Sequence, residues 1–191
     1  MSGDQKISQR NLDNLLLEAV QNHKLSSCQH LLAEGANQDA HFYGAEQETL
    51  LMLSSNLNLF LFEILLEYNP NLYHCDIDGN DILGYLIKNH NQEALEILLS
   101  KNKKVNFESI NNDGLTPLEM CFETNSLYLA NILIAYGAPF SENQWHEYST
   151  IYEENEPQNK IYQQNKARHQ KDCLNQSTPN DVMPVFSKPR L

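Results

Sequence analysis

Residues 113–138 read DGLTPLEMCFETNSLYLANILIAYGA, and this stretch contains two markers that recur along the first part of the chain. The first marker is a Leu-Leu or Leu-Ile pair, found at 31–32, 65–66, 98–99 and 133–134. The second is a leucine fifteen residues before each pair, at positions 16, 50, 83 and 118. Both series have spacings of 34, 33 and 35 residues. Self-similarity at a fixed period of this size indicates a stacked array of repeats.

Each repeat has the apolar pattern of two short helices. In the third repeat, one apolar face is formed by Leu83, Leu86 and Ile87. After a polar break at 88–91, a second face is formed by Ala94, Leu95, Leu98 and Leu99. Spacings of three and four residues are typical of amphipathic helices. Neither helix can bury its stripe alone, so neighbouring repeats must stack.

The residues between these helices support the same division. Each second helix is followed by a residue type that adopts a left-handed conformation at low cost, namely Gly35, Asn69, Asn102 and Gly137. The breaks between the two helices of a repeat are assigned to His23, Leu57, His90 and Asn125. Asp78-Gly79 and Asp113-Gly114 are turn dipeptides, which predict a tight reversal.

These features together resemble the ankyrin-repeat family. The residues that carry the resemblance are Asp113–Leu118, Leu133-Ile134, Gly137-Ala138 and Leu31–Ala36. The resemblance covers residues 11–140 and implies an all-α solenoid of helix-turn-helix units with finger loops. We predict four repeats at about 11–40, 41–73, 74–107 and 108–140, after an N-terminal lead-in at 1–10.

The chain also departs from the family pattern. The histidine that follows Thr-Pro-Leu in the family is replaced by Leu17, Leu51, Gly84 and Glu119. That histidine usually ties adjacent finger loops together by hydrogen bonds, so we expect looser fingers here. The second repeat has His41–Glu46 in place of the Asp-Gly turn, which implies a non-standard finger loop.

The C-terminal third does not continue the repeat. Ser141–Gln144 is a capping-box pattern, followed at helical spacing by Trp145, Tyr148 and Tyr152. We predict a helical cap at 141–173 that covers the open end of the last repeat, with an exposed aromatic binding patch as the alternative. Residues 159–172 are polar almost all round, so a helix there is expected either to be solvated or to extend the cap weakly.

A disordered tail is predicted at 174–191, because this segment has little to bury. It contains a small apolar island, Val182–Phe186. The island is either an apolar stretch that makes only non-specific contacts or a short linear motif.

The charge of the chain excludes some classes of partner. Thirteen Lys and Arg residues stand against 25 Asp and Glu, giving a net charge of −12. Residues 1–140 hold 7 of the bases and 18 of the acids, so most of the excess lies on the repeats. Nucleic-acid binding requires clustered cations, whereas this distribution favours a basic or neutral protein partner. The chain has no apolar run of about 18 residues and no secretory signal pattern, so we predict no membrane span.

Motifs of catalysis and metal binding are missing from the sequence. It has no phosphate-binding loop, metalloprotease motif or nucleophile elbow, and no CxxC pair among its four cysteines. We therefore predict no cofactor, no metal and free thiols in a reducing compartment. Cys28 and Cys121 are expected in the core. Cys75 follows His74, but adjacent residues of an extended segment point to opposite sides, so an exposed thiol is predicted rather than a catalytic pair.

The function that follows is a non-enzymatic protein-interaction module, monomeric and cytoplasmic. The resemblance implies that partners bind the concave face formed by finger tips and first helices. Candidate finger residues are Phe42, Tyr43, Asp76, Asp78, Asn112 and Asp113. Candidate helix residues are Glu18, Met52, Asn56, Tyr85, Lys88 and Glu123.

Two alternatives stay open. The chain resembles secreted effectors of intracellular bacteria, which act on host proteins. The features that it shares with them are its 23 asparagines, its degenerate array and the missing secretory signal. An enzyme with an active site between repeats, involving Cys75 or a His/Asp cluster, is the other alternative.

Overall fold

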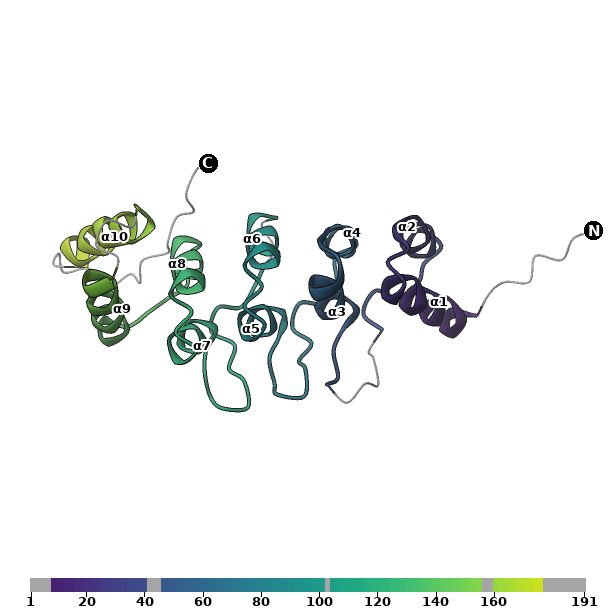
Figure 1. The fold of residues 1–191 in the computed structure, drawn as a ribbon, viewed down its shortest axis with the longest axis horizontal. Coiled ribbons are helices and arrows are strands. Elements are labelled where there is room, and N and C mark those ends of the chain that lie inside the picture. The colour runs from purple at the N-terminus through teal and green to yellow at the C-terminus, as the bar shows by residue number, and fades with distance from the viewer. Residues whose placement is uncertain (1–7, 41–45, 102–103, 156–159, 177–191) are drawn as a thin grey trace, which may run out of the picture.

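The computed structural model describes residues 8–40, 46–101, 104–155 and 160–176. Within these ranges the chain forms four helix pairs followed by two further helices (Figure 1). The pairs are α1 (Gln9–Gln21) with α2 (Leu25–Ala33), α3 (Leu50–Leu57) with α4 (Leu59–Glu67), α5 (Ile82–Lys88) with α6 (Gln92–Ser100), and α7 (Pro117–Glu123) with α8 (Leu127–Ala135). The predicted all-α solenoid is confirmed. Its first helix begins at Gln9, inside the predicted lead-in.

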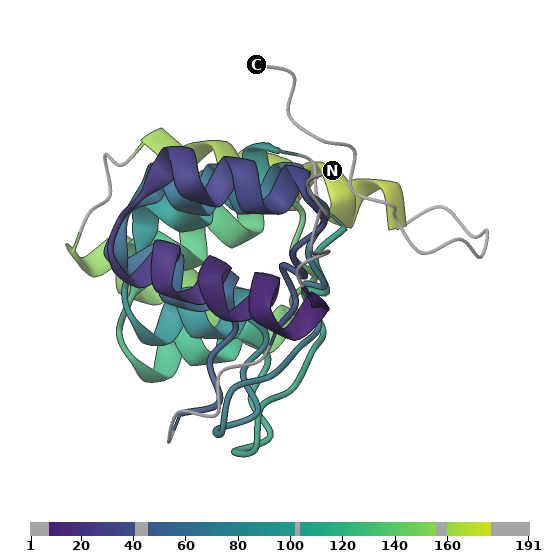
Figure 2. The same ribbon diagram turned by 90° about the vertical axis from the view of Figure 1, so that its right-hand side faces the viewer.

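The helix pairs lie side by side in a row of two layers. The first helices α1, α3, α5 and α7 form one layer, and the second helices form the other (Figures 1 and 2). Each of α1, α3 and α5 contacts the next first helix, and α4 contacts both α2 and α6. Loops that project beyond the first-helix layer connect one pair to the next; we call them fingers.

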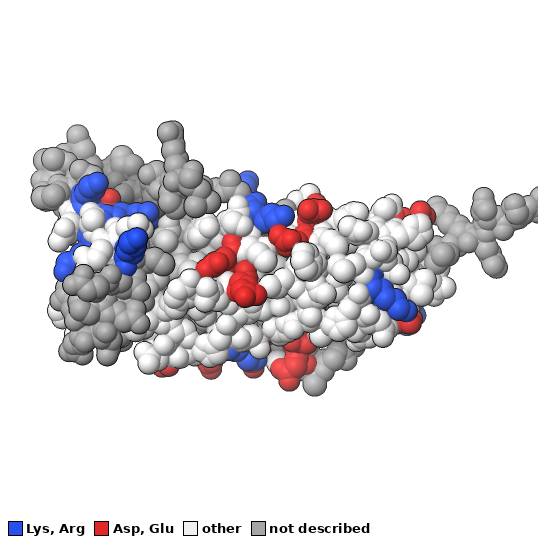
Figure 3. Space-filling view, turned by 45° about the horizontal axis from the view of Figure 1, so that its top comes forward, with Lys and Arg blue, Asp and Glu red and all other residues white. Residues whose placement is uncertain are grey.

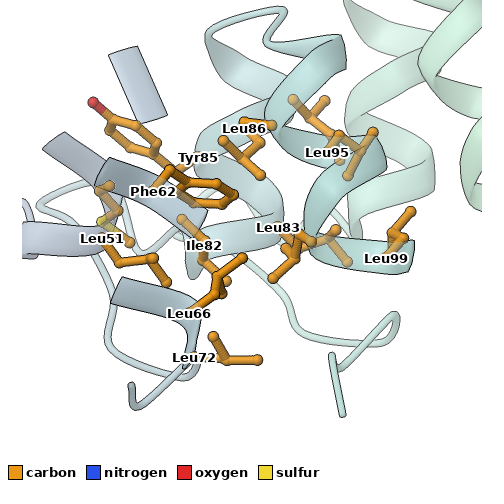
Figure 4. Packing of buried hydrophobic residues seen from close by; sticks show 14 of the residues in the cluster. Leu51, Phe62, Leu66, Leu72, Ile82, Leu83, Tyr85, Leu86, Leu95 and Leu99 are labelled. Atoms are coloured by element: carbon orange, nitrogen blue, oxygen red, sulfur yellow. The ribbon is translucent and has the colours of Figure 1, made fainter. Parts of the chain in front are cut away.

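The core lies between the two layers and runs through neighbouring pairs. Phe62 and Leu66 of α4 meet Ile82 and Leu86 of α5, with Leu51 of α3 beside them (Figure 4). These five side chains are at most 2 % exposed. Burying a side chain of this type is worth about 1.5–3 kcal/mol, and here much of that burial is between pairs. The apolar stripes read from the sequence are thus the contact surfaces of the solenoid.

Local hydrogen bonds set where the helices begin and end. Thr49, Asp81 and Thr116 are the N-caps of α3, α5 and α7, and their side chains accept backbone N–H bonds of the first turn. Thr116 also forms a capping box with Glu119. Between the two helices of a pair, the predicted left-handed residues are confirmed at His23, His90 and Asn125, with φ of 55, 50 and 51°.

The turn of the second pair differs from that prediction. Leu57 ends α3 in helical conformation, and Asn58 follows it in an extended conformation with φ of −165°. Asn58 caps the start of α4 through Phe60 and Leu61. Only Asn58 lies between α3 and α4, whereas three residues lie between the two helices of each other pair. There is therefore no room for a left-handed residue. Asn102, which was predicted as the left-handed residue after the second helix of the third repeat, lies outside the described residues.

The last two helices, α9 (Glu142–Asn155) and α10 (Lys160–Gln176), cover the end of the array (Figure 1). Trp145 is 8 % exposed and Tyr148 is fully buried, so they form a cap and not an exposed aromatic patch. The Trp145 ring packs against Phe140 and stacks on His169 of α10, with centroids 4.3 Å apart for the stacked pair. The side chain of Tyr152 lies outside the described residues. The predicted capping helix is confirmed, and a second helix joins it.

Of the two alternatives for residues 159–172, a solvated helix or a weak extension of the cap, the structure shows the extension. α10 packs on α8, and its Asn165 is 3 % exposed. The Asn165 side chain donates to Asn131 Oδ1 of α8 at 3.4 Å and to the Tyr148 hydroxyl at 3.1 Å, and Tyr148 itself donates to Asn131. The helix also continues to Gln176, three residues into the predicted tail. The rest of that tail, 177–191, lies outside the described residues.

Arg168 joins α10 to the C-terminal end of α8. Its Nη1 is 3.3 Å from the carbonyl oxygens of both Ile134 and Ala135. Those carbonyls lie in the last turn of α8, where helices leave backbone acceptors unpaired and carry a partial negative charge. The Arg168 guanidinium is therefore favourable at this end of α8. It holds α10 in place, although α10 has almost no apolar stripe.

We expect Arg168→Met to loosen α10 while the solenoid stays folded. Hydrogen bonds to a charged group contribute about 1.5–3 kcal/mol, so amide exchange in α10 should accelerate by about 10- to 100-fold. The matched control is Lys171→Met at an exposed position of the same helix. Equal exchange rates in the two variants would show that Arg168 does not hold α10.

Candidate interaction surface

The fingers and the exposed strip of the first helices form one surface, which we call the finger face. Asn56, Lys88 and Glu123 occupy the same place in successive first helices, seven residues after the N-cap in each case, and all three are exposed. Lys88 reaches the neighbouring finger, because its Nζ lies 2.6 Å from Asp78 Oδ2. The strip of first-helix residues therefore borders the finger tips.

The finger turns are held by side chains inside them. Asp76 Oδ1 accepts hydrogen bonds from the backbone of Asp78 and Asn80, at 3.0 and 2.8 Å. In the next finger Asn111 Oδ1 accepts the equivalent bonds from Asp113 and Leu115, at 3.1 and 3.0 Å. Asp76 is 6 % exposed. The prediction that Asp76 contacts a partner is therefore wrong: its carboxylate shapes the turn that presents Asp78.

The fingers are also bonded to each other, contrary to the expectation of loose loops. The backbone N–H of Ile77 donates to the carbonyl of Glu46, and that of Asn112 donates to the carbonyl of Asp78, both at 2.9 Å. The Asn112 side chain adds a bond to the Ile77 carbonyl at 3.0 Å. Backbone and asparagine groups thus provide the ties that the missing histidine would have made.

Two predicted helix residues are covered and not available to a partner. Met52 is fully buried, and Tyr85 is 3 % exposed. Figure 4 shows Tyr85 among the buried hydrophobic side chains. The Tyr85 hydroxyl donates to Glu48 and accepts from Asn56 Nδ2 at 2.8 Å, so it links α5 to α3. Burial raises the pKa of Tyr85 well above its ordinary value, and the bond to Glu48 adds to this. A first helix is enclosed by its partner helix and by two neighbouring first helices, which leaves only a narrow strip exposed.

The remaining candidates are exposed, and the structure adds two that the sequence did not indicate. Asp78, Lys88, Asn112, Asp113, Glu123, Asn56 and Glu18 are exposed, while Phe42 and Tyr43 lie outside the described residues. The additional residues are Ile77 and Ile110, which are 47 % and 65 % exposed on neighbouring fingers. Each is an isolated apolar residue in a turn segment, which was the one available signal.

The Asp78 ion pair changes the electrostatics of this surface. The hydrogen bond from Lys88 to Asp78 holds the pKa of Lys88 above its ordinary value, so the ammonium stays charged. The Lys88 ammonium compensates the charge of the Asp78 carboxylate. In the next finger, the carboxylate of Asp113 is exposed. The finger face therefore presents exposed isoleucines beside acidic groups.

The described residues offer little for catalysis at this surface. Cys28 and Cys121 are buried, as predicted, and Cys75 is exposed. Although the residue is exposed, partial desolvation of its sulfur raises the pKa of the Cys75 thiol, and the charges of Asp81 and Asp76 raise it further, so the reactive thiolate is disfavoured. In the described ranges no cluster of three or more His, Cys, Asp or Glu side chains could hold a metal ion. Nor does any described helix have the length and apolar character needed to cross a membrane.

Comparison with known proteins gives one family match. The model for ankyrin repeats (3 copies) matches residues 16–109 and 51–144, which together span about two thirds of the chain. A comparison with curated proteins gave no significant match.

We expect Gly79→Ala to destabilise the protein more than Gly114→Ala. Both glycines have φ of 78°, so both substitutions have the same backbone cost. A Cβ on Gly79 would lie 2.5 Å from the Asn112 side chain and 2.9 Å from the backbone nitrogen of Asn112. A Cβ on Gly114 would have no other atom within 4 Å. Urea unfolding should show the difference; equal midpoints would mean that the fingers are not packed as described.

Tyr85→Phe should lower the free energy of unfolding by about 1–3 kcal/mol, because Glu48 and Asn56 lose a partner in a partly buried cluster. Tyr128→Phe is the control. It also removes a hydroxyl bonded to a glutamate, Glu96, but on an exposed ring, so little change is expected. If Tyr85→Phe kept full stability, the covered hydroxyl would have no structural role.

Proposed function

The chain belongs to the ankyrin-repeat family, and we propose that it is a non-enzymatic interaction module whose finger face binds a basic or neutral protein. Ankyrin repeats are in general protein–protein interaction modules, and stacked repeats provide an extended binding surface. The family assignment supports this class of function, and the chemistry of the finger face supports the kind of partner.

The observation that carries the proposal is the pair of exposed isoleucines on neighbouring fingers, Ile77 within its turn and Ile110 directly before the turn of the next finger. Ile77 and Ile110 are held on fingers bonded to each other, so they are presented on a pre-formed surface. Exposed apolar side chains beside carboxylates suit a partner with apolar pockets rimmed by Lys or Arg. Asp78 and Asp113 follow Ile77 and Ile110 closely in the two fingers. Binding should weaken with added salt, because exposed charges are screened.

We propose further that the protein acts as a monomer in the cytoplasm. A role as a bacterial effector in a host cell is the alternative carried by the asparagine content and the degenerate array. A translocation reporter fused to the full chain separates these two, since export would support the effector. An enzyme is disfavoured, because the family is typically non-enzymatic and the Cys75 thiol is held in its protonated form.

We expect replacement of both finger isoleucines, Ile77→Ser with Ile110→Ser, to reduce partner capture from the native cell extract strongly. Each buried isoleucine contributes about 1.5–3 kcal/mol to a contact, so the captured partner should decrease at least about tenfold. Phe60→Ser is the matched control, because Phe60 is 70 % exposed on the second-helix layer.

Quantitative mass spectrometry of the captured proteins decides the outcome. A partner retained by the Phe60 variant and lost by the isoleucine variant supports the finger face. A partner that both variants retain equally places the binding surface elsewhere on the chain.

A further inference from the structure

The second-helix layer carries a groove that the finger face does not use. It has a volume of about 650 Å³ and opens mainly between α6 and α8, with Leu59 of α4 at one end and Gln164 of α10 at the other. Ile97 and Ile132 lie in it as apolar residues, and Glu93 and Glu96 line it as acidic ones. Figure 3 shows acidic side chains gathering on this layer over α4 and α6. The volume is in the range of pockets that bind peptide side chains or small molecules.

The two glutamates of the groove differ from their neighbours on α4. Glu63 and Glu67 lie 3.7 and 4.0 Å from Lys101, which compensates their charge. In the part of the chain that the structure describes, no lysine or arginine lies within ion-pair distance of Glu93 or Glu96. They are three residues apart on α6, so their carboxylates share one side of that helix. Gln92 and Tyr128 donate hydrogen bonds to Glu96, but these neutral groups leave its charge in place. The groove therefore combines an apolar floor with two carboxylates that no described lysine or arginine pairs with.

The chain contains a segment with the complementary chemistry. Residues 182–190 read VMPVFSKPR, four large apolar residues followed by two cations, with no acidic residue among them. Pro184 and Pro189 fix their own φ and disfavour helical conformations of Met183 and Lys188, which lowers the entropy lost when the segment lies along a groove. We propose that residues 182–190 dock in the groove of their own chain, with the apolar part on Ile97 and Ile132 and the cations at Glu93 and Glu96.

The length of the chain allows this return. Gln164 borders the groove, and α10 ends twelve residues later at Gln176, about 18 Å along the helix axis. Extended chain covers about 3.3 Å per residue, so residues 177–182 are enough to come back to the groove. From residue 182 to residue 190 the segment then reaches about 26 Å. Crossing from α8 over α6 to α4 takes about 20 Å, since packed helices are 8–10 Å apart.

Docking within one chain has a functional consequence. A tethered segment has an effective concentration in the millimolar range, so even weak contacts keep it in place. Any partner that uses the groove must then displace the segment. This inference concerns the face opposite the fingers and does not depend on the proposed binding at the finger face.

NMR relaxation of the full-length chain tests the proposal. Amides of residues 182–190 should have order parameters near those of rigid backbone, about 0.85, and they should fall below about 0.6 in Glu93→Lys with Glu96→Lys. The control Glu18→Lys with Glu34→Lys makes the same charge change at exposed sites outside the groove, and it should leave the segment ordered. Circular dichroism and the thermal midpoint confirm that both variants fold.

A charge swap distinguishes a direct contact from an indirect effect. Adding Lys188→Glu and Arg190→Glu to the Glu93→Lys, Glu96→Lys variant should restore the high order parameters. Low values in the unmodified protein, or high values that survive the glutamate changes, would overturn the proposal. Order that increases with protein concentration would show that a second copy supplies the segment, and this also contradicts docking within one chain.

Discussion

Neither helix of a pair can remove its own apolar stripe from water, and the rest of the structure depends on this constraint. Leu16, Leu83 and Leu118 are buried in a core that neighbouring helices of the array build together. The chain must therefore stack its pairs in order, and the connecting loops must project together on one side. Stacking also creates an end where a stripe would face solvent. Trp145 and Tyr148 cover that end, so the cap follows from the same constraint as the repeats.

The parts of the fold with a local cause could be predicted from the sequence. The period of the leucines gave the helix pairs, and His23, His90 and Asn125 marked the turns between them because few residue types adopt that conformation. Leu57 could not be assigned correctly, since the sequence does not show at which turn a residue is missing. The firm docking of α10, where only a solvated helix or a weak extension was expected, has another cause. It rests on Asn165 and other polar groups, which leave no apolar period to detect.

The finger residues of the interaction surface could be predicted, because turns are exposed however the repeats stack. Asp78 and Asp113 lie in turn dipeptides, and both are exposed as expected. Met52 and Tyr85 were misplaced because the covered part of a first helix depends on the neighbouring pairs, which no single helix pattern reveals. Ile110 was missed because an isolated isoleucine looks the same in a core and on a surface. Such residues become informative only when their neighbours are known.

The cap makes the two ends of the array unequal. Among the described residues, α1 and α2 meet another helix pair on one side only, and Leu15 is 42 % exposed, whereas α8 is covered by α10. In an array with interactions only between neighbours, the unit with fewer interfaces opens first. On the ribosome the repeats emerge before the helices that cover their open end. Throughout synthesis the growing array therefore exposes an apolar edge, and the nascent chain shields it only when α9 and α10 have left the exit tunnel.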